Sequence, residues 1–181
     1  MGLELVELVM RIEETFAIQI PDRVASELTT PRKVTDFILT QVEESQFPLP
    51  CLSQKAFHLL RRSFIQHLNN PRQQFRLDTT LREFVPEEKR DVWKEIGLAI
   101  GSKSWPELFR PWLLGFIPPR VQSVRELVEY LVENEPLVVK GEELTWSRAQ
   151  VWDVLKRLII DETAATDFSE DSRFVQDMHL N

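Results

Sequence analysis

Residues 3–16 read LELVELVMRIEETF, and the interpretation of the fold starts from this stretch. Its apolar residues recur at steps of three and four, which places them on one side of a helix: Leu5, Leu8, Val9, Ile12 and Phe16. The charged residues fall on the other side: Glu4, Glu7, Arg11 and Glu14. Such a helix is stable in water only when its apolar side is packed, so another part of the chain must cover it.

Helical patterns with recognisable start signals continue along the rest of the chain. Thr30 before Pro31 predicts an N-cap followed by proline at the first helical position. Capping boxes of the form Ser-x-x-Glu or Ser-x-x-Gln predict helix starts at Ser104, Ser123 and Ser147. Ser53 is a further predicted cap, and residues 47–50 and 135–141 are predicted linkers. No segment alternates as a strand would, so the sequence predicts an all-α protein.

The composition excludes several classes of protein. The chain has 181 residues, of which 43% are hydrophobic, too many for a disordered chain. No run of about 18 apolar residues occurs, so we expect no membrane-spanning helix and no membrane partner. A single cysteine, Cys51, excludes an internal disulfide and a cysteine-based zinc site, and a reducing, cytoplasmic setting is expected. His58, His67 and His179 do not have metal-ligand spacing with nearby carboxylates, so no metal site is predicted.

The charge is unevenly distributed. The net charge of −7 argues against nucleic-acid binding. Residues 1–46 carry 9 acidic and 4 basic side chains, whereas residues 51–135 carry 11 acidic and 13 basic ones. The basic side chains of the middle segment include Arg61, Arg62, Arg72, Arg76, Arg82, Lys89 and Arg90. They form a solvated face, a docking face for the acidic part of the same chain, or a surface for an acidic partner or nucleic acid.

Two parts of the chain resemble each other. With an offset of 93, Phe75, Asp78, Thr79, Leu81 and Val85 fall on Phe168, Asp171, Ser172, Phe174 and Met178. With an offset of 90, Val34, Asp36, Phe37 and Ile38 fall on Val124, Glu126, Leu127 and Val128. The middle segment therefore has a complete set of elements, and each end of the chain has a complementary part of that set.

The N-terminal stretch resembles the second, third and fourth helices of an acyl carrier protein. The residues that carry the resemblance are 3–10 (LELVELVM), 13–16 (EETF), 18–22 (IQIPD) and 28–34 (LTTPRKV). Residues 147–181, which end in FVQDMHLN, resemble the first helix and long loop of the same family. Because these parts stand in reverse order, the arrangement resembles a circular permutation. Residues 51–135 resemble a second, more degenerate copy in the normal order.

The resemblance implies two small helical bundles. One joins residues 1–46 to residues 136–181, and the other is residues 51–135. Neither chain end can bury its apolar residues alone, which is the physical reason to expect that they associate. They can meet within one chain or between two, so the protein is predicted to be a monomer or a domain-exchanged dimer.

Acyl carrier proteins bear phosphopantetheine on a serine at the start of the second helix, where the helix dipole favours a phosphate. The register of the resemblance puts Gly2 at that serine and Asn181 near the aspartate that precedes it. Glycine has no hydroxyl, so no prosthetic group and no cofactor are expected. Of the other serines, Ser172 is interpreted as a turn residue and Ser53 as a helix cap.

The expected function is therefore a non-catalytic interaction or regulatory module. In the family, the acidic second helix binds partner enzymes, which makes Glu4, Glu7 and Glu14 the candidate partner-binding residues. The implied partner is an enzyme of acyl or polyketide-type synthesis. Two alternatives remain: a true acyl or peptidyl carrier with a cryptic attachment serine, and an enzyme that uses Cys51 with His58, or a carboxylate.

Overall fold

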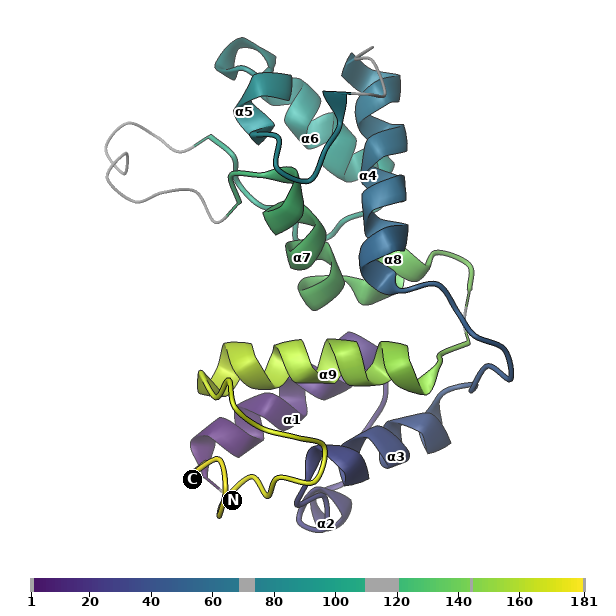
Figure 1. Cartoon of the computed structure of the whole chain (residues 1–181), viewed down its shortest axis with the longest axis vertical. Coiled ribbons are helices and arrows are strands. Elements are labelled where there is room, and N and C mark those ends of the chain that lie inside the picture. The colour runs from purple at the N-terminus through teal and green to yellow at the C-terminus, as the bar shows by residue number, and fades with distance from the viewer. Residues whose placement is uncertain (1, 69–73, 110–120, 144, 181) are drawn as a thin grey trace. The chain divides into compact units, whose positions relative to one another are not determined.

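The computed structural model describes residues 2–68, 74–109, 121–143 and 145–180, and these are helices joined by loops (Figure 1). In these ranges the only strand-like pairings are two isolated bridges, between Glu44 and Trp146 and between Thr80 and Ser123, and there is no sheet. The predicted all-α class is confirmed. None of the helices in these ranges combines the length and the hydrophobicity needed to cross a bilayer.

The chain divides into two compact units, residues 1–51 with 141–181 and residues 52–140. The helices of the first unit are α1 (Leu3–Phe16), α2 (Asp22–Ala25), α3 (Pro31–Gln41) and α9 (Arg148–Thr163). Those of the second unit are α4 (Leu52–Leu68), α5 (Leu81–Phe84), the 3₁₀ turn η2 (Glu87–Lys89), α6 (Arg90–Ala99), α7 (Val124–Asn134) and α8 (Pro136–Lys140).

In the first unit, α9 packs against both α1 and α3 (Figure 1). The buried residues come from all three helices and include Leu8, Ile12, Val34, Ile38, Val154 and Leu158. Arg11 reaches from α1 to α9, where it pairs with Asp161 at 3.3 Å and Glu162 at 2.6 Å. The apolar side of α1 is therefore covered by a helix that lies more than 130 residues further along the chain.

Two short segments of the first unit are paired next to α9. The Trp146 amide donates to the Glu43 carbonyl at 2.8 Å, and the Ser45 amide donates to the Trp146 carbonyl at 2.9 Å. The Trp146 side chain is 2% exposed, and its ring centroid lies 4.9 Å from that of Phe16. We call this arrangement, formed by residues 43–45 and 146, the seam.

In the second unit, α4 contacts α6, α7 and α8. Aromatic rings fill the space beside it, with Phe64 within 5.1–6.2 Å of the ring centroids of Phe75, Phe84 and Trp93. The sequence predicted a linker over residues 135–141, and this was wrong for residues 136–140. They form α8, which packs against α4 and α7 and buries Val139.

The helix starts were predicted with mixed success. The Thr30, Ser123 and Ser147 side chains each cap a helix, and both capping boxes at Ser123 and Ser147 are complete. No helix begins at Ser104, because its hydroxyl donates to Glu135 Oε1 at 2.9 Å instead. Ser53 is not a cap either, since α4 already begins at Leu52.

Each unit joins a loop to the first turn of a helix by the same set of contacts. In the first unit, the Arg32 amide donates to Glu170 O, the Phe174 amide donates to Thr29 O, and Arg32 pairs with Asp171. In the second, the Arg125 amide donates to Leu77 O, the Leu81 amide donates to Gln122 O, and Arg125 pairs with Asp78. Each residue of the first unit named here differs by 93 positions from its counterpart in the second unit. This offset also holds for the starts of α3 and α7, for which the sequence comparison used 90.

Candidate functional site

The helix α1 begins where the sequence predicts. Gly2 is its N-cap residue, with the extended backbone angles φ −74° and ψ 172°, and it offers no side chain to the free amides of the first turn. Glu4 is the acidic residue of that turn. The candidate counterpart of the family's aspartate, Asn181, lies outside the described residues.

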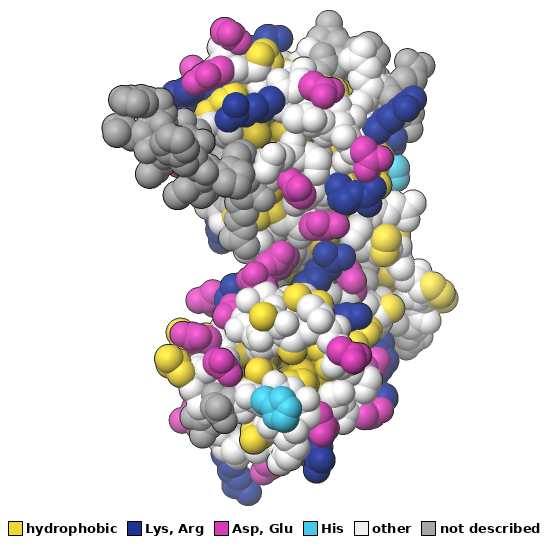
Figure 2. All heavy atoms as spheres, turned by 60° about the vertical axis from the view of Figure 1, so that its left-hand side comes forward, with side chains coloured by type: hydrophobic (Ala, Val, Ile, Leu, Met, Phe, Trp, Pro, Cys, Tyr) yellow, Lys and Arg dark blue, Asp and Glu magenta, His cyan; other side chains and the backbone are white. Residues whose placement is uncertain are grey.

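The exposed surface of α1 combines acidic and apolar side chains. Glu4, Glu7 and Glu14, the predicted partner-binding residues, are all exposed. The same helix has three exposed apolar residues that sequence reasoning missed: Leu3 at 73%, Val6 at 37% and Met10 at 53% exposure. We call these six residues the α1 face. Figure 2 shows hydrophobic and acidic side chains next to each other on the surface of the first unit, in the lower part of the view.

Arg11 interrupts the acidic residues of α1 in the sequence but not in the structure. Its guanidinium pairs with Asp161 and Glu162 of α9. Because both partners are carboxylates of the same unit, the positive charge of Arg11 is neutralised within the fold. Arg11 lines a hollow beside Glu7, Met10 and Glu14, but its charge is paired with α9, so this surface remains acidic.

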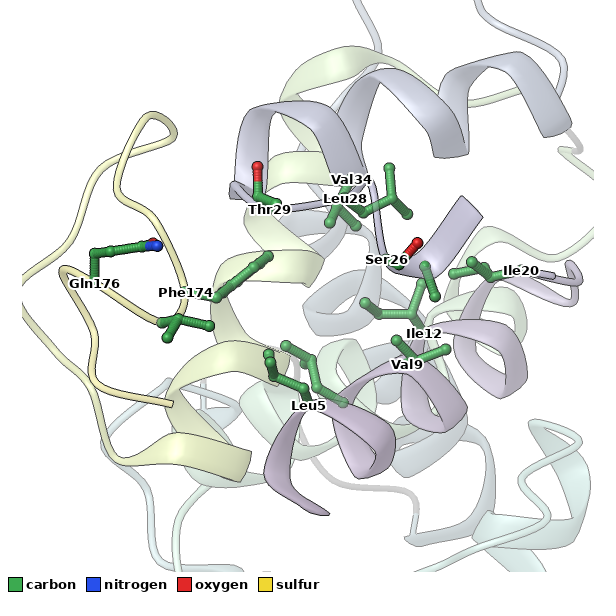
Figure 3. A pocket seen from close by; sticks show the side chains of 13 residues that line it. Leu5, Val9, Ile12, Ile20, Ser26, Leu28, Thr29, Val34, Phe174 and Gln176 are labelled. Atoms are coloured by element: carbon green, nitrogen blue, oxygen red, sulfur yellow. The ribbon is translucent and has the colours of Figure 1, made fainter. Parts of the chain in front are cut away.

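A cavity of about 240 Å³ lies beneath α1, which we call the α1 cavity. Figure 3 shows Leu5, Val9 and Ile12 of α1 on one side and Leu28 and Val34 on the other, with Phe174 of the C-terminal segment pointing between them. Two of its polar lining groups already have partners within the fold. Ser26 Oγ donates to Arg23 O at 2.7 Å, and Thr29 Oγ1 accepts from Lys33 Nζ at 3.0 Å. The lining therefore suits an apolar group.

The only Asp-Ser dipeptide is in a turn, as predicted. Ser172 Oγ accepts a hydrogen bond from the Ser169 amide at 3.0 Å. Asp171 is held by Arg32, whose Nε and Nη2 donate to the two carboxylate oxygens at 2.6 and 2.8 Å. The hydrogen bond from Arg32 lowers the pKa of Asp171, slight burial opposes it, and the positive charge of Arg32 adds to the lowering.

The other candidate residues have local roles. Cys51 is exposed and precedes α4. His58 Nδ1 lies 2.8 Å from Arg61 Nη2, and His67 Nδ1 lies 2.8 Å from Ser63 O. Across the ranges that the structure describes, no group of three or more histidine, cysteine or acidic side chains is placed to hold a metal ion.

Part of the basic cluster of the middle segment contacts aromatic rings. The Arg61 guanidinium lies 5.2 Å from the Phe57 ring centroid, and those of Arg82 and Arg90 each lie 5.7 Å from that of Phe109. Arg90 also pairs with Glu87 at 2.8 Å. Arg72, another member of the cluster, is outside the described residues.

Sequence reasoning missed one buried polar cluster, centred on Glu135. This side chain is 8% exposed, and its carboxylate accepts hydrogen bonds from the hydroxyls of Ser102 and Ser104 and from the amides of Lys103 and Ser104. The one sequence signal at this cluster is the pattern at Ser104, which predicts a helix cap, whereas its hydroxyl donates to Glu135.

No model of a protein family matches the chain, and no solved structure gives a significant match.

Proposed function

We propose that the first unit is a non-catalytic protein-docking module of the acyl-carrier type, without a prosthetic group. Its α1 face binds the partner, which is an enzyme of acyl or polyketide-type synthesis. The observation that carries the proposal is the exposure of Leu3, Val6 and Met10 on the side of α1 that also bears Glu7 and Glu14. The sequence resemblance described above supplies the class of partner.

The α1 face has the two components of a binding surface. Apolar side chains in the centre of an interface contribute affinity because they leave water on binding. Acidic side chains around them attract a basic partner and orient it during the encounter. One side of α1 therefore stabilises the unit, because Leu8 and Ile12 are buried there. On the other side, Met10 is exposed and can contact a partner.

The start of α1 supports the absence of a prosthetic group. A helix N-terminus attracts a phosphate through its free amides and its dipole, but a phosphodiester also needs an oxygen to which it can be attached. Gly2 occupies this position and has none.

The permuted and duplicated origin is supported by the matching contacts within each unit. Arg32 with Asp171 and Arg125 with Asp78 are ion pairs at 2.6 and 2.8 Å, and both residues of each pair differ by 93 positions from those of the other. Phe75 and Phe168 are also 93 positions apart, and each contacts an aromatic ring of the preceding helix, Phe57 or Trp152, although these two rings are 95 positions apart. In the first unit the Arg32–Asp171 pair joins the two chain ends, as a permutation requires.

The docking proposal is tested by changing the α1 face without changing the core. The variants E7K/E14K and M10D are compared with wild type for binding to purified enzymes of acyl and polyketide-type synthesis. We expect binding to fall at least tenfold in each variant. E27K is the matched control, because Glu27 is exposed in the same unit but outside α1. Equal binding by wild type and both α1 variants would contradict the proposal.

A second candidate function is carriage of an apolar group on a cryptic serine. It is favoured by the α1 cavity, whose 240 Å³ lies somewhat below the range of about 300–1,000 Å³ typical of ligand pockets. Coexpression with a phosphopantetheinyl transferase, followed by intact mass measurement, separates the two functions. We expect an unchanged mass. A gain of one phosphopantetheine that disappears in S172A or S53A would establish the carrier instead.

A further inference from the structure

The second unit contains a larger cavity, of about 690 Å³, between α6 and residues 102–109. We call it the tryptophan cavity. Trp93, Trp105 and Leu108 provide apolar lining, and the exposed Lys94 and Lys103 also line it. Its volume is within the range of about 300–1,000 Å³ found for ligand pockets.

The aromatic wall of this cavity is fixed by the fold. Trp93 Nε1–H donates to Pro106 O at 2.8 Å, and the ring centroids of Trp93 and Trp105 are 4.7 Å apart. Trp105 lies directly on Gly97 of α6, where a Cβ atom would come within 2.5 Å of its ring. A binding surface that is already ordered loses less entropy when a ligand binds.

The segment that bears Lys103 is also fixed. The Lys103 amide donates to Glu135 Oε2 at 2.8 Å, and the neighbouring Ser104 amide donates to Oε1 of the same carboxylate at 3.0 Å. The backbone of Lys103 is thus held against the end of α7, while its side chain is exposed beside the cavity.

The lining carries an excess of positive charge. Arg90, Lys94 and Lys103 face a single carboxylate of the lining, Glu107. Arg90 pairs with Glu87, but neither lysine makes an ion pair with a residue in the described ranges. In addition, the Trp105 Nε1–H is buried and has no hydrogen-bond acceptor among those residues. A buried donor without a partner is uncommon in folded proteins.

We propose that the tryptophan cavity is a binding site for a small organic anion with a planar apolar body. The anionic group binds at Lys94 and Lys103, and the planar body packs against Trp93 and Trp105. This site belongs to the second unit and is independent of the docking function proposed for the first.

The probe for this site is 8-anilinonaphthalene-1-sulfonate, an aromatic anion of this class, titrated into the full chain. Binding is followed by the indole N–H signals in ¹H–¹⁵N spectra, with the Trp105 signal assigned by W105F. We expect the Trp105 signal to shift on binding. This readout separates the tryptophan cavity from the α1 cavity, which contains no tryptophan in its lining. An unmoved Trp105 signal at saturating probe would overturn the proposal.

The role of charge is tested with K94E and K103E. Both residues are exposed, so the variants should fold, and we expect each to weaken the affinity reported by Trp105 at least tenfold. K156E, at an exposed lysine of the first unit, should change it less than twofold. The neutral analogue N-phenyl-1-naphthylamine should bind this site at least tenfold more weakly. Equal affinity in K94E, K103E and K156E would also overturn the proposal.

Discussion

Glu135 shows how a buried carboxylate remains charged. Burial alone acts to raise the pKa of Glu135, but hydrogen bonds from Ser102, Lys103 and Ser104 outweigh this and hold it below its ordinary value. The ionised form is therefore favoured more in the folded chain than in the unfolded chain. The stability that this provides is complete above the ordinary pKa of about 4.3 and is lost as the pH falls through the lower pKa of the folded state.

The variant E135Q tests this linkage. We expect it to reduce the free energy of unfolding of the second unit by about 2 kcal/mol at pH 7, because hydrogen bonds to a charged acceptor are replaced by hydrogen bonds to an amide. The difference should shrink below about pH 4, where the carboxyl is protonated in the unfolded chain, and should disappear once the pH is below the lower pKa of the folded state. Urea unfolding between pH 7 and pH 3 measures it. E95Q, at an exposed glutamate of α6, is the control and should behave as wild type at every pH.

Glycine is required at position 97 because the ring of Trp105 packs directly against it, and not because the backbone conformation demands it. A Cβ at this position would lie 2.5 Å from Cγ of Trp105, whose ring packs against Trp93. We expect G97A to destabilise the second unit by about 1–3 kcal/mol, as overpacking does in other cores. In a W105A background the same change should cost much less, because the clash is gone. Equal costs in the two backgrounds, measured by thermal unfolding, would argue against this contact.

At the scale of elements, the start of a helix was predicted correctly where the capping side chain had no competing hydrogen-bond partner elsewhere in the fold. Ser123 and Ser147 complete their capping boxes with Glu126 and Gln150. Ser104 has the same local pattern, but the buried Glu135, distant in sequence, takes its hydroxyl. A local motif cannot reveal such a competitor.

The site was predicted in part for a similar reason. The charges of Glu4, Glu7 and Glu14 indicate exposure wherever the helix packs, and all three are exposed. Leu3, Val6 and Met10 extend the apolar arc of α1 beyond the width that one neighbouring helix can cover. Which edge of a wide arc remains uncovered depends on the position of α9, and that is a tertiary property.

The two complete capping boxes should contribute similarly to stability. Replacing Ser147 or Ser123 by alanine removes the acceptor for the amide of Gln150 or Glu126. We expect S147A to destabilise the first unit and S123A the second, each by about 1 kcal/mol. Thermal unfolding followed by calorimetry measures both. S53A is the control, since Ser53 lies inside the first turn of α4 and caps nothing. A cost for S53A as large as the other two would show that capping is not the cause.

At the scale of the whole molecule, the first unit depends on both ends of the chain. Deleting residues 147–181 removes α9 and uncovers Leu8 and Ile12 of α1. We expect the rest of the first unit to lose cooperative melting, while the indole signals of Trp93 and Trp105 keep reporting a folded second unit. Cooperative melting of the shortened first unit would contradict the dependence.

The seam has a consequence for how the chain could have acquired its second unit. Ser45 and Trp146 exchange backbone hydrogen bonds across a gap of about one hundred residues, so the polypeptide departs from and returns to the first unit at neighbouring points. The entropic cost of bringing together the ends of the intervening segment rises only with the logarithm of its length. A connection whose two ends are held together in this way tolerates inserted segments of very different lengths. This position is therefore a natural place for a gene to gain, exchange or lose an entire folded unit.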